Sequence, residues 1–161
     1  MTYRAFVALG SNLQDPAAQV TRALDELAAL PATRLVKRSS LYRTAPVGYD
    51  NQPDFINAAA EVETDLDPLD LLRALLALET SHGRERPFPN APRVLDLDLL
   101  LYDDQVMQTP ELTLPHPRLH ERGFVLFPLA EIAPALEIPG KGRVNDLVQR
   151  CHDQGVERLA A

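Results

Sequence analysis

Two Asp-Pro pairs, at positions 15–16 and 67–68, constrain the fold of this chain more than any other feature of its sequence. The pair is typical of a helix start, because the carboxylate can accept a backbone hydrogen bond at the cap and proline fits the first helical position. Leucines recur at helical spacing after each pair, until Pro31 in the first case and Gly83 in the second. We therefore predict two amphipathic helices that each pack one face on a sheet.

Apolar runs surround these helices and predict four strands. Their ranges are Ala5 to Leu9, Thr33 to Tyr42, Asp54 to Glu63, and Val94 to Tyr102. The order of strand, helix, strand, strand, helix, strand predicts an α+β, ferredoxin-like βαββαβ core with an antiparallel sheet and the helices on one face. The region after Pro110 is rich in proline, so we expect an irregular C-terminal extension of short strands and one-turn helices laid against this core.

Size and composition indicate one domain spanning residues 1–161, because 161 residues with 45% hydrophobic side chains can fill a single core. We expect this domain to be cytoplasmic. The net charge of -7 disfavours binding to nucleic acid. No apolar run approaches the ~18 residues that a membrane-spanning helix requires. The single cysteine, Cys151, cannot form an intrachain disulfide, which fits a reducing compartment. We expect a monomer without nucleic-acid or membrane partners.

The run Leu95-Asp96-Leu97-Asp98-Leu99 is the most informative local pattern. Side chains alternate faces along a strand, so both carboxylates would project one way while the leucines enter the core. Adjacent like charges are costly unless a cation neutralises them, and paired aspartate oxygens together with phosphate oxygens are a usual magnesium arrangement. A solvated strand face is the alternative that alternation alone leaves open.

Three arginines, Arg84, Arg86 and Arg93, lie in a proline-interrupted loop immediately before the paired aspartates. Guanidinium groups match phosphate oxygens, and phosphoryl transfer needs positive charge around the transferred group. The loop and the aspartates together outline a polyphosphate site, although each arginine by itself could be an ordinary surface charge. The sequence contains neither GxxxxGK[ST] nor GxGxxG, which excludes a P-loop kinase as far as sequence can.

Three further residues leave both a functional and a structural interpretation open. Asn57 interrupts an apolar strand, where its amide could read the edge of a heterocycle or could lie exposed on the outer face of the sheet. His116 lies between two prolines and could be a fixed donor or could satisfy a local backbone group. Phe124 could offer an aromatic face or belong to the core. The turn formers at 10–12 are a weak phosphate-loop candidate and fit a tight turn better.

Taken together, the segments resemble the hydroxymethyl-dihydropterin pyrophosphokinase family over nearly the whole chain. Seven blocks carry the resemblance in order: ALGSNL (8–13), SSLYRTAPVG (39–48), QPDFINA (52–58), GRER (83–86), PRVLDLDLLLY (92–102), LPHPR (114–118) and RGFVLFPLAEIAP (122–134). The resemblance implies the ferredoxin-like fold and transfer of the pyrophosphoryl group of ATP to hydroxymethyl-dihydropterin, which yields AMP and the pterin diphosphate in folate biosynthesis.

The resemblance also implies roles for individual residues. Asp96 and Asp98 would hold two Mg2+ ions that bridge the ATP phosphates, with Asp98 also near the attacking hydroxyl, while Arg84 and Arg93 would neutralise the transferred group. Positions that look like the nucleotide site are Glu79, Arg86, Leu99, Thr113, His116 and Arg122. Positions that look like the pterin pocket are Thr44, Pro46, Val47, Phe55, Asn57 and Phe124.

One segment departs from the family pattern. Many members carry Arg-Trp-Gly just before the Pro-Arg of PRxLDLD, whereas this chain has Phe-Pro-Asn-Ala at 88–91. The proline-interrupted loop at 83–93 is a candidate lid over the site. We expect this lid to be altered, and hence altered ATP affinity or product release, without loss of the reaction. Two other functions remain as alternatives to a pyrophosphokinase. A metal-dependent nuclease or phosphatase would hydrolyse without an acceptor, and a small-ligand regulatory module would not need magnesium.

Overall fold

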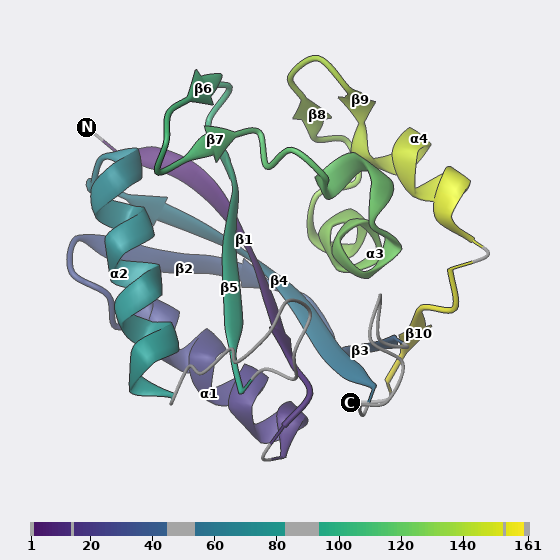
Figure 1. The fold of residues 1–161 in the computed structure, drawn as a ribbon. Helices are drawn as coiled ribbons and strands as arrows, with labels where there is room; N and C mark the ends of the chain where they lie inside the picture. Colours follow the sequence, from purple (N-terminus) through teal and green to yellow (C-terminus); the bar gives the residue numbers. More distant parts are fainter. Residues whose placement is uncertain (1, 14, 45–53, 83–93, 153, 160–161) are drawn as a thin grey trace.

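The structure is a computed structural model, and it describes residues 2–13, 15–44, 54–82, 94–152 and 154–159. Its main sheet has the strand order β10-β3-β4-β1-β5, and β2 also pairs with β4 (Figure 1). The strands are β1 (Tyr3–Ser11), β2 (Thr33–Arg38), β3 (Tyr42–Thr44), β4 (Phe55–Thr64), β5 (Asp96–Tyr102) and β10 (Glu157–Arg158). All of these pairings are antiparallel, as the sequence predicts.

One face of the sheet is covered by the two helices that the Asp-Pro pairs predict, α1 (Pro16–Ala28) and α2 (Pro68–Ser81) (Figure 1). Alternate residues of the strands point into this layer and form the larger apolar cluster with both helices. Leu71 and Leu75 of α2 and Leu27 of α1 are completely buried there. The α+β, ferredoxin-like fold is therefore confirmed.

The C-terminal region packs on the opposite face of the sheet. We call this face of the sheet the α3 face. The helix α3 (Gly123–Ile132) packs on it, and α4 (Val144–Val148) packs beside α3 (Figure 1). The prolines predict only one-turn helices in this region, whereas α3 has ten residues. Helices were predicted on one face of the sheet, and α3 covers the second face as well. Two short hairpins complete the region: β6 (Met107–Gln108) with β7 (Thr113–Leu114), and β8 (Glu137–Ile138) with β9 (Gly142–Arg143).

The two helix starts differ in a way that the shared dipeptide hides. The Asp67 carboxylate caps α2 by accepting a hydrogen bond of 2.8 Å from the Asp70 backbone N–H. Asp15 instead has a left-handed backbone, with φ of 62°, and its side chain makes no capping hydrogen bond, so the predicted side-chain cap of α1 is wrong. Aspartate tolerates this conformation better than most residues, and proline at the first helical position remains a helix-start signal that does not need the cap.

The segment predicted as one continuous strand is divided into β2 and β3, which both pair with β4. Ser39 lies at the break, and its backbone N–H donates to the Ala59 carbonyl oxygen while its hydroxyl accepts from the Ala59 N–H. This side chain therefore substitutes for a backbone acceptor at the point where the ladder is interrupted.

In the described part of the chain, no helix combines the length and the apolar character needed to cross a membrane.

Candidate functional site

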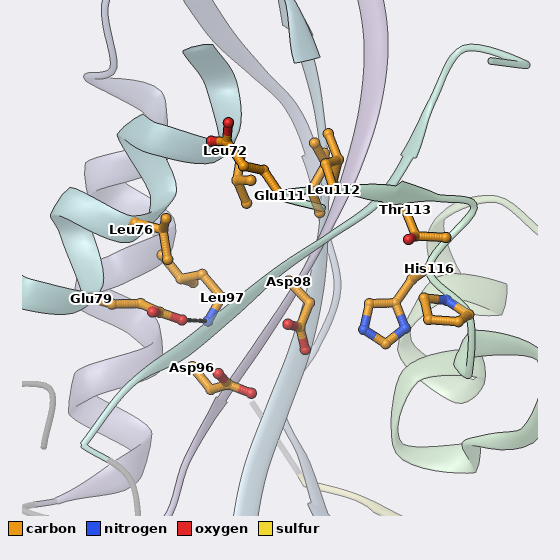
Figure 2. A pocket seen from close by; sticks show the side chains of 12 residues that line it. Leu72, Leu76, Glu79, Asp96, Leu97, Asp98, Glu111, Leu112, Thr113 and His116 are labelled. Carbon is orange, nitrogen blue, oxygen red and sulfur yellow. Dashed lines mark hydrogen bonds between the residues drawn. The ribbon is translucent and has the colours of Figure 1, made fainter. Parts of the chain in front are cut away.

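Strand β5 places the paired aspartates as the alternation predicts. Leu95, Leu97 and Leu99 are buried in the cluster under α1 and α2, whereas Asp96 and Asp98 are half-buried and project toward the α3 face. Figure 2 shows the two carboxylates side by side along the strand. The register with β1 shifts between Phe6 and Val7, beyond Asp98, so the bulge leaves this alternation intact.

Small residues on β1 lie next to the aspartates. Asp98 is opposite Ala8 and Asp96 is opposite Gly10, and Gly10 is in turn opposite Asn57 on β4. A Cβ on Gly10 would lie 3.0 Å from Asn57 Oδ1, so glycine allows the amide to lie across the strand. Gly10 belongs to β1, and so the prediction of a tight turn at this residue is wrong.

The Asn57 side chain is 4% exposed, so the alternative of an exposed asparagine is wrong. Its Nδ2 donates a hydrogen bond of 2.9 Å to Thr44 Oγ1. Thr44 lies opposite Phe55 in the β3–β4 pairing, which brings three of the expected pterin-pocket residues together at one end of the α3 face. Pro46 and Val47, also expected there, lie outside the described residues.

Glu79 connects helix α2 to the strand between the two aspartates. Its carboxylate is buried, and Oε2 accepts a hydrogen bond of 2.6 Å from the Leu97 backbone N–H (Figure 2). A charge-assisted hydrogen bond at the residue between Asp96 and Asp98 fixes the strand backbone on which both depend. Glu79, expected as a nucleotide-site position, therefore also positions the aspartates.

A pocket of about 280 Å³ runs alongside β5, between α2 and the segment that includes β7. Four carboxylates line it, together with apolar side chains of α2 and β5 (Figure 2). Its lining residues are Leu72, Leu76, Glu79, Asp96, Leu97, Asp98, Leu99, Glu111, Leu112, Thr113, His116 and Pro117. The structure thus gathers the expected nucleotide-site residues Glu79, Leu99, Thr113 and His116 around the paired aspartates.

His116 lies on the far side of this pocket from α2 (Figure 2). Its backbone N–H donates to the Leu100 carbonyl oxygen at 2.9 Å, and its Nδ1 accepts from the Arg118 N–H at 3.3 Å. Burial and the nearby Arg122 cation lower the pKa of His116 below its usual 6.5, against the opposing effect of Asp96. The environment of the imidazole therefore favours its neutral form. His116 combines the backbone role and the pocket position that the sequence left as alternatives.

Arg122 and Phe124 lie at the start of α3. The Arg122 guanidinium lies over the Phe124 ring, 5.5 Å from its centroid. Phe124 packs partly buried against the apolar cluster beneath α3, which gives the ring a fixed place. Arg84, Arg86 and Arg93, expected to neutralise the phosphates, lie outside the described residues.

The donor set fits a magnesium site that a substrate completes. Magnesium prefers oxygen ligands and is usually bound by one or two carboxylates together with substrate phosphates and water. Asp96 and Asp98 supply two carboxylates on one side of a rigid strand. Among the described residues, no group of three or more His, Cys, Asp or Glu side chains could hold an ion alone. The remaining ligands would therefore come from phosphate oxygens and water.

Some lining residues escaped sequence reasoning. Leu72 and Leu76 belong to the periodic leucines of α2 and gave no signal of exposure to a pocket. Glu111 lies in a polar turn between β6 and β7, and only the return of that hairpin toward α2 brings it to the pocket. Gly10 does not line the pocket, and its position beside Asn57 could have been noticed from the spacing of small residues at 8 and 10 on one strand face.

Residues 6–134 match the family model described as 7,8-dihydro-6-hydroxymethylpterin-pyrophosphokinase (HPPK). The chain belongs to the HPPK family. This confirms the resemblance on which the site assignments rest, and the matched range contains every lining residue of the pocket.

Two curated relatives extend the match over nearly the whole chain, and both are named 2-amino-4-hydroxy-6-hydroxymethyldihydropteridine pyrophosphokinase. The protein of Pseudomonas aeruginosa is 46% identical over 159 residues, which cover 99% of this chain and 98% of the relative. That of Haemophilus influenzae is 43% identical over 155 residues, with 96% and 97% coverage.

Among solved structures, a crystal structure of Plasmodium falciparum HPPK-DHPS resembles this HPPK chain with a TM-score of 0.79 at 16% identity. The match covers 100% of this chain and 49% of that one, so this chain spans about half the length of that protein. At this level of identity the likeness supports the fold alone.

Proposed function

We propose that this chain transfers the pyrophosphoryl group of ATP to the hydroxyl of 6-hydroxymethyl-7,8-dihydropterin, at the pocket beside Asp96 and Asp98. The observation that carries the proposal is the pair of carboxylates on one side of β5, within a pocket large enough for part of a nucleotide. Asn57, which bonds to Thr44, lies opposite Gly10 on β1, and Gly10 in turn lies opposite Asp96. Membership in the HPPK family supports the choice of substrates.

The reaction forms a bond between the pterin hydroxyl oxygen and the β-phosphorus of ATP and breaks the bond between that phosphorus and the oxygen it shares with the α-phosphate. AMP leaves, and the hydroxyl proton passes to solvent. Bound to Asp96 and Asp98, two magnesium ions would offset the negative charge of the phosphates. Asp98 would also accept a hydrogen bond from the attacking hydroxyl and orient it in line.

The remaining residues bind and position the substrates. Glu79 holds the strand, so that both aspartates keep a fixed spacing. Asn57 would read the pterin edge through Oδ1, since its Nδ2 donates to Thr44. Phe55 and Phe124 offer ring faces for stacking, and Leu99, Thr113 and His116 contact the nucleotide. Arg84, Arg86, Arg93 and Arg122 would neutralise phosphate oxygens, and Pro46 and Val47 would complete the pterin pocket.

We also propose that the enzyme acts in the cytoplasm as a monomer on small-molecule substrates only, without a nucleic-acid or membrane partner. The net charge of -7 supports the first of these exclusions, because it repels a polyphosphate backbone. Light scattering on the eluting peak of a size-exclusion column tests the monomer, for which we expect a mass near 17.8 kDa.

The decisive experiment is product analysis with the purified protein, ATP, magnesium and hydroxymethyl-dihydropterin, with AMP and ADP resolved by anion-exchange chromatography. We expect AMP and pterin diphosphate in equal amounts, and neither product when magnesium or the pterin is omitted. The Asp98→Asn protein is the matched control, because it keeps the side-chain size and removes the charge.

Other products would exclude the proposal in recognisable ways. AMP formed in the absence of the pterin would indicate a hydrolase, and ADP would indicate transfer of one phosphoryl group. Pterin binding with no turnover under any metal condition would indicate a binding module.

A further inference from the structure

Glu111 is the one lining carboxylate that the proposed function leaves without a role. Among the four described carboxylates of the pocket, Asp96 and Asp98 form the expected metal pair, and Glu79 bonds to the backbone between them. Glu111 comes from the turn between β6 and β7 and lies at the opposite end of the pocket from Asp96, beside Leu72 (Figure 2).

An arginine of α2 forms an ion pair with Glu111. Arg73 Nη2 lies 3.6 Å from Glu111 Oε2, and Arg73 Nη1 lies 3.4 Å from Asp70 Oδ1. The ion pair directs one carboxylate oxygen toward α2, while the Glu111 side chain remains 58% exposed. The second oxygen is thus available to a ligand that fills the pocket, and a carboxylate can only accept hydrogen bonds from it.

The distribution of charge sets the orientation of a bound nucleotide. A phosphate beside Glu111 would place like charges together, with only the shared Arg73 to offset them. Asp96 and Asp98, by contrast, would hold magnesium, which would offset the negative charge of the phosphates. The phosphates therefore belong at the Asp96 end, and the nucleoside belongs at the Glu111 end.

The walls at the Glu111 end match a nucleoside. Leu72 and Leu76 line the pocket from α2, and Leu76 is one of the few large apolar side chains left exposed among the described residues. Such walls can cover a base and the apolar edge of a sugar, which leaves the sugar hydroxyls as donors that need an acceptor. Glu111 is the acceptor placed beside them.

We propose that Glu111 is a specificity-determining residue that accepts hydrogen bonds from the vicinal hydroxyls of the nucleotide sugar, with Arg73 holding it in position. The inference rests on the proposed function, because it takes ATP as the occupant of the pocket. It assigns this chain a preference for ribonucleotides that resides in a side chain remote from the reacting phosphates.

The test compares ATP with 2′,3′-dideoxy-ATP in the wild-type protein and in Glu111→Ala. For the wild type we expect the dideoxy compound to raise KM about 5- to 10-fold. This is less than the more than tenfold effect typical of a buried hydrogen bond to a charged group, because the Glu111 side chain is more than half exposed and water competes for its oxygens. In Glu111→Ala the two nucleotides should give equal KM values. Glu137→Ala, which removes an exposed carboxylate on β8, should keep the wild-type preference.

Titration calorimetry with the magnesium complexes of the same two nucleotides separates this inference from the proposed function. Discrimination in binding that disappears in Glu111→Ala supports Glu111 even in a preparation that gives no AMP, a result that would overturn only the proposed function. Equal discrimination by the wild type and Glu111→Ala overturns the inference. So does a change in Glu111→Ala confined to the comparison of ATP with inosine triphosphate, because the carboxylate would then contact the base amino group.

Discussion

The α3 face of the sheet has an apolar end and a polar end, and strands β1 and β5 contribute side chains to both. At its apolar end, Phe6, Leu100 and Leu101 are buried beneath α3. At its polar end, the same strands β1 and β5 present Gly10, Asp96 and Asp98. Along β1 the side chains on this face shrink from Phe6 through Ala8 to Gly10. The space that α3 and large side chains fill at one end is left for a ligand at the other.

The comparison shows how a reactive site can share a rigid support with the core. Paired carboxylates on a flexible loop would spread apart under their mutual repulsion, but on β5 they are held by backbone pairing on one side and by Glu79 on the other. Stability should therefore depend mainly on the apolar end of the α3 face, and activity mainly on its polar end. The following substitutions test that separation.

Asp98→Asn should have the largest effect. We expect kcat to fall about 100- to 1000-fold, since several kcal/mol of charge stabilisation are lost. The melting temperature should stay the same or rise, because the repulsion from Asp96 is relieved. Steady-state kinetics and a thermal melt measure the two quantities, and a fall in activity of less than tenfold would contradict the metal role.

Leu126→Ala should have the opposite signature at the apolar end. Leu126 is 0% exposed in the cluster beneath α3, and truncating such a leucine costs about 2–5 kcal/mol of unfolding free energy. Both KM values should be unchanged well below the lowered melting temperature. Val106→Ala, at a side chain that is 68% exposed, is the control and should cost less than about 0.5 kcal/mol in urea denaturation. A raised KM in Leu126→Ala would show that the two ends are coupled.

Gly10→Ala acts on the polar end through shape alone. The added methyl group would meet Asn57 Oδ1 at 3.0 Å and displace the amide, so the pterin KM should rise by about tenfold, as for a lost hydrogen bond, while the ATP KM stays unchanged. Adding Asn57→Ala to this variant should raise the pterin KM little further, because both changes remove the same contact between Asn57 and the pterin. Additive losses would mean that Gly10 and Asn57 act separately.

The smallest effect concerns pH. Because the pKa of His116 is lowered by burial and by Arg122, the unfolded chain takes up a proton on this residue at a higher pH than the folded chain does. The contribution of His116 to stability is therefore fully present well above pH 6.5 and is lost as the pH falls through that value. His116→Gln should reduce the loss of stability between pH 7.5 and 5.5 in urea titrations, and an unchanged loss would show that His116 does not cause it.

Much of the fold follows from local patterns, and what was missed depends on distant contacts. The alternation at 95–99 predicts the two faces of β5 correctly, and proline marks both helix starts. Helix α3 was missed because it is apolar on nearly every side and contains Pro128, so it offers neither a helical period nor an uninterrupted run. Its stability comes from burial beneath the sheet, which no local window reports.

In the candidate site, too, some residues are predictable from the sequence, whereas other contacts exist only in the folded chain. Asp96 and Asp98 follow from their own strand, and the expected residues Thr44, Asn57, Glu79 and His116 follow from the family resemblance. The contact of Glu79 with Leu97, 18 residues away, and the pairing of Glu111 with Arg73 exist only after α2 and the β6–β7 hairpin dock on β5. The lid arginines and the altered segment 88–91 remain predictions for kinetic tests.

The Glu79 contact has a consequence for the behaviour of the protein in concentrated solution. Strand β5 ends the sheet, and the outward amide and carbonyl groups of such a strand can template the addition of a strand from another molecule. Here a carboxylate oxygen occupies the Leu97 amide, and the backbone of His116 occupies the Leu100 carbonyl. The contacts that hold the aspartates thereby also protect this edge of the sheet, beside the pocket, from pairing with another molecule.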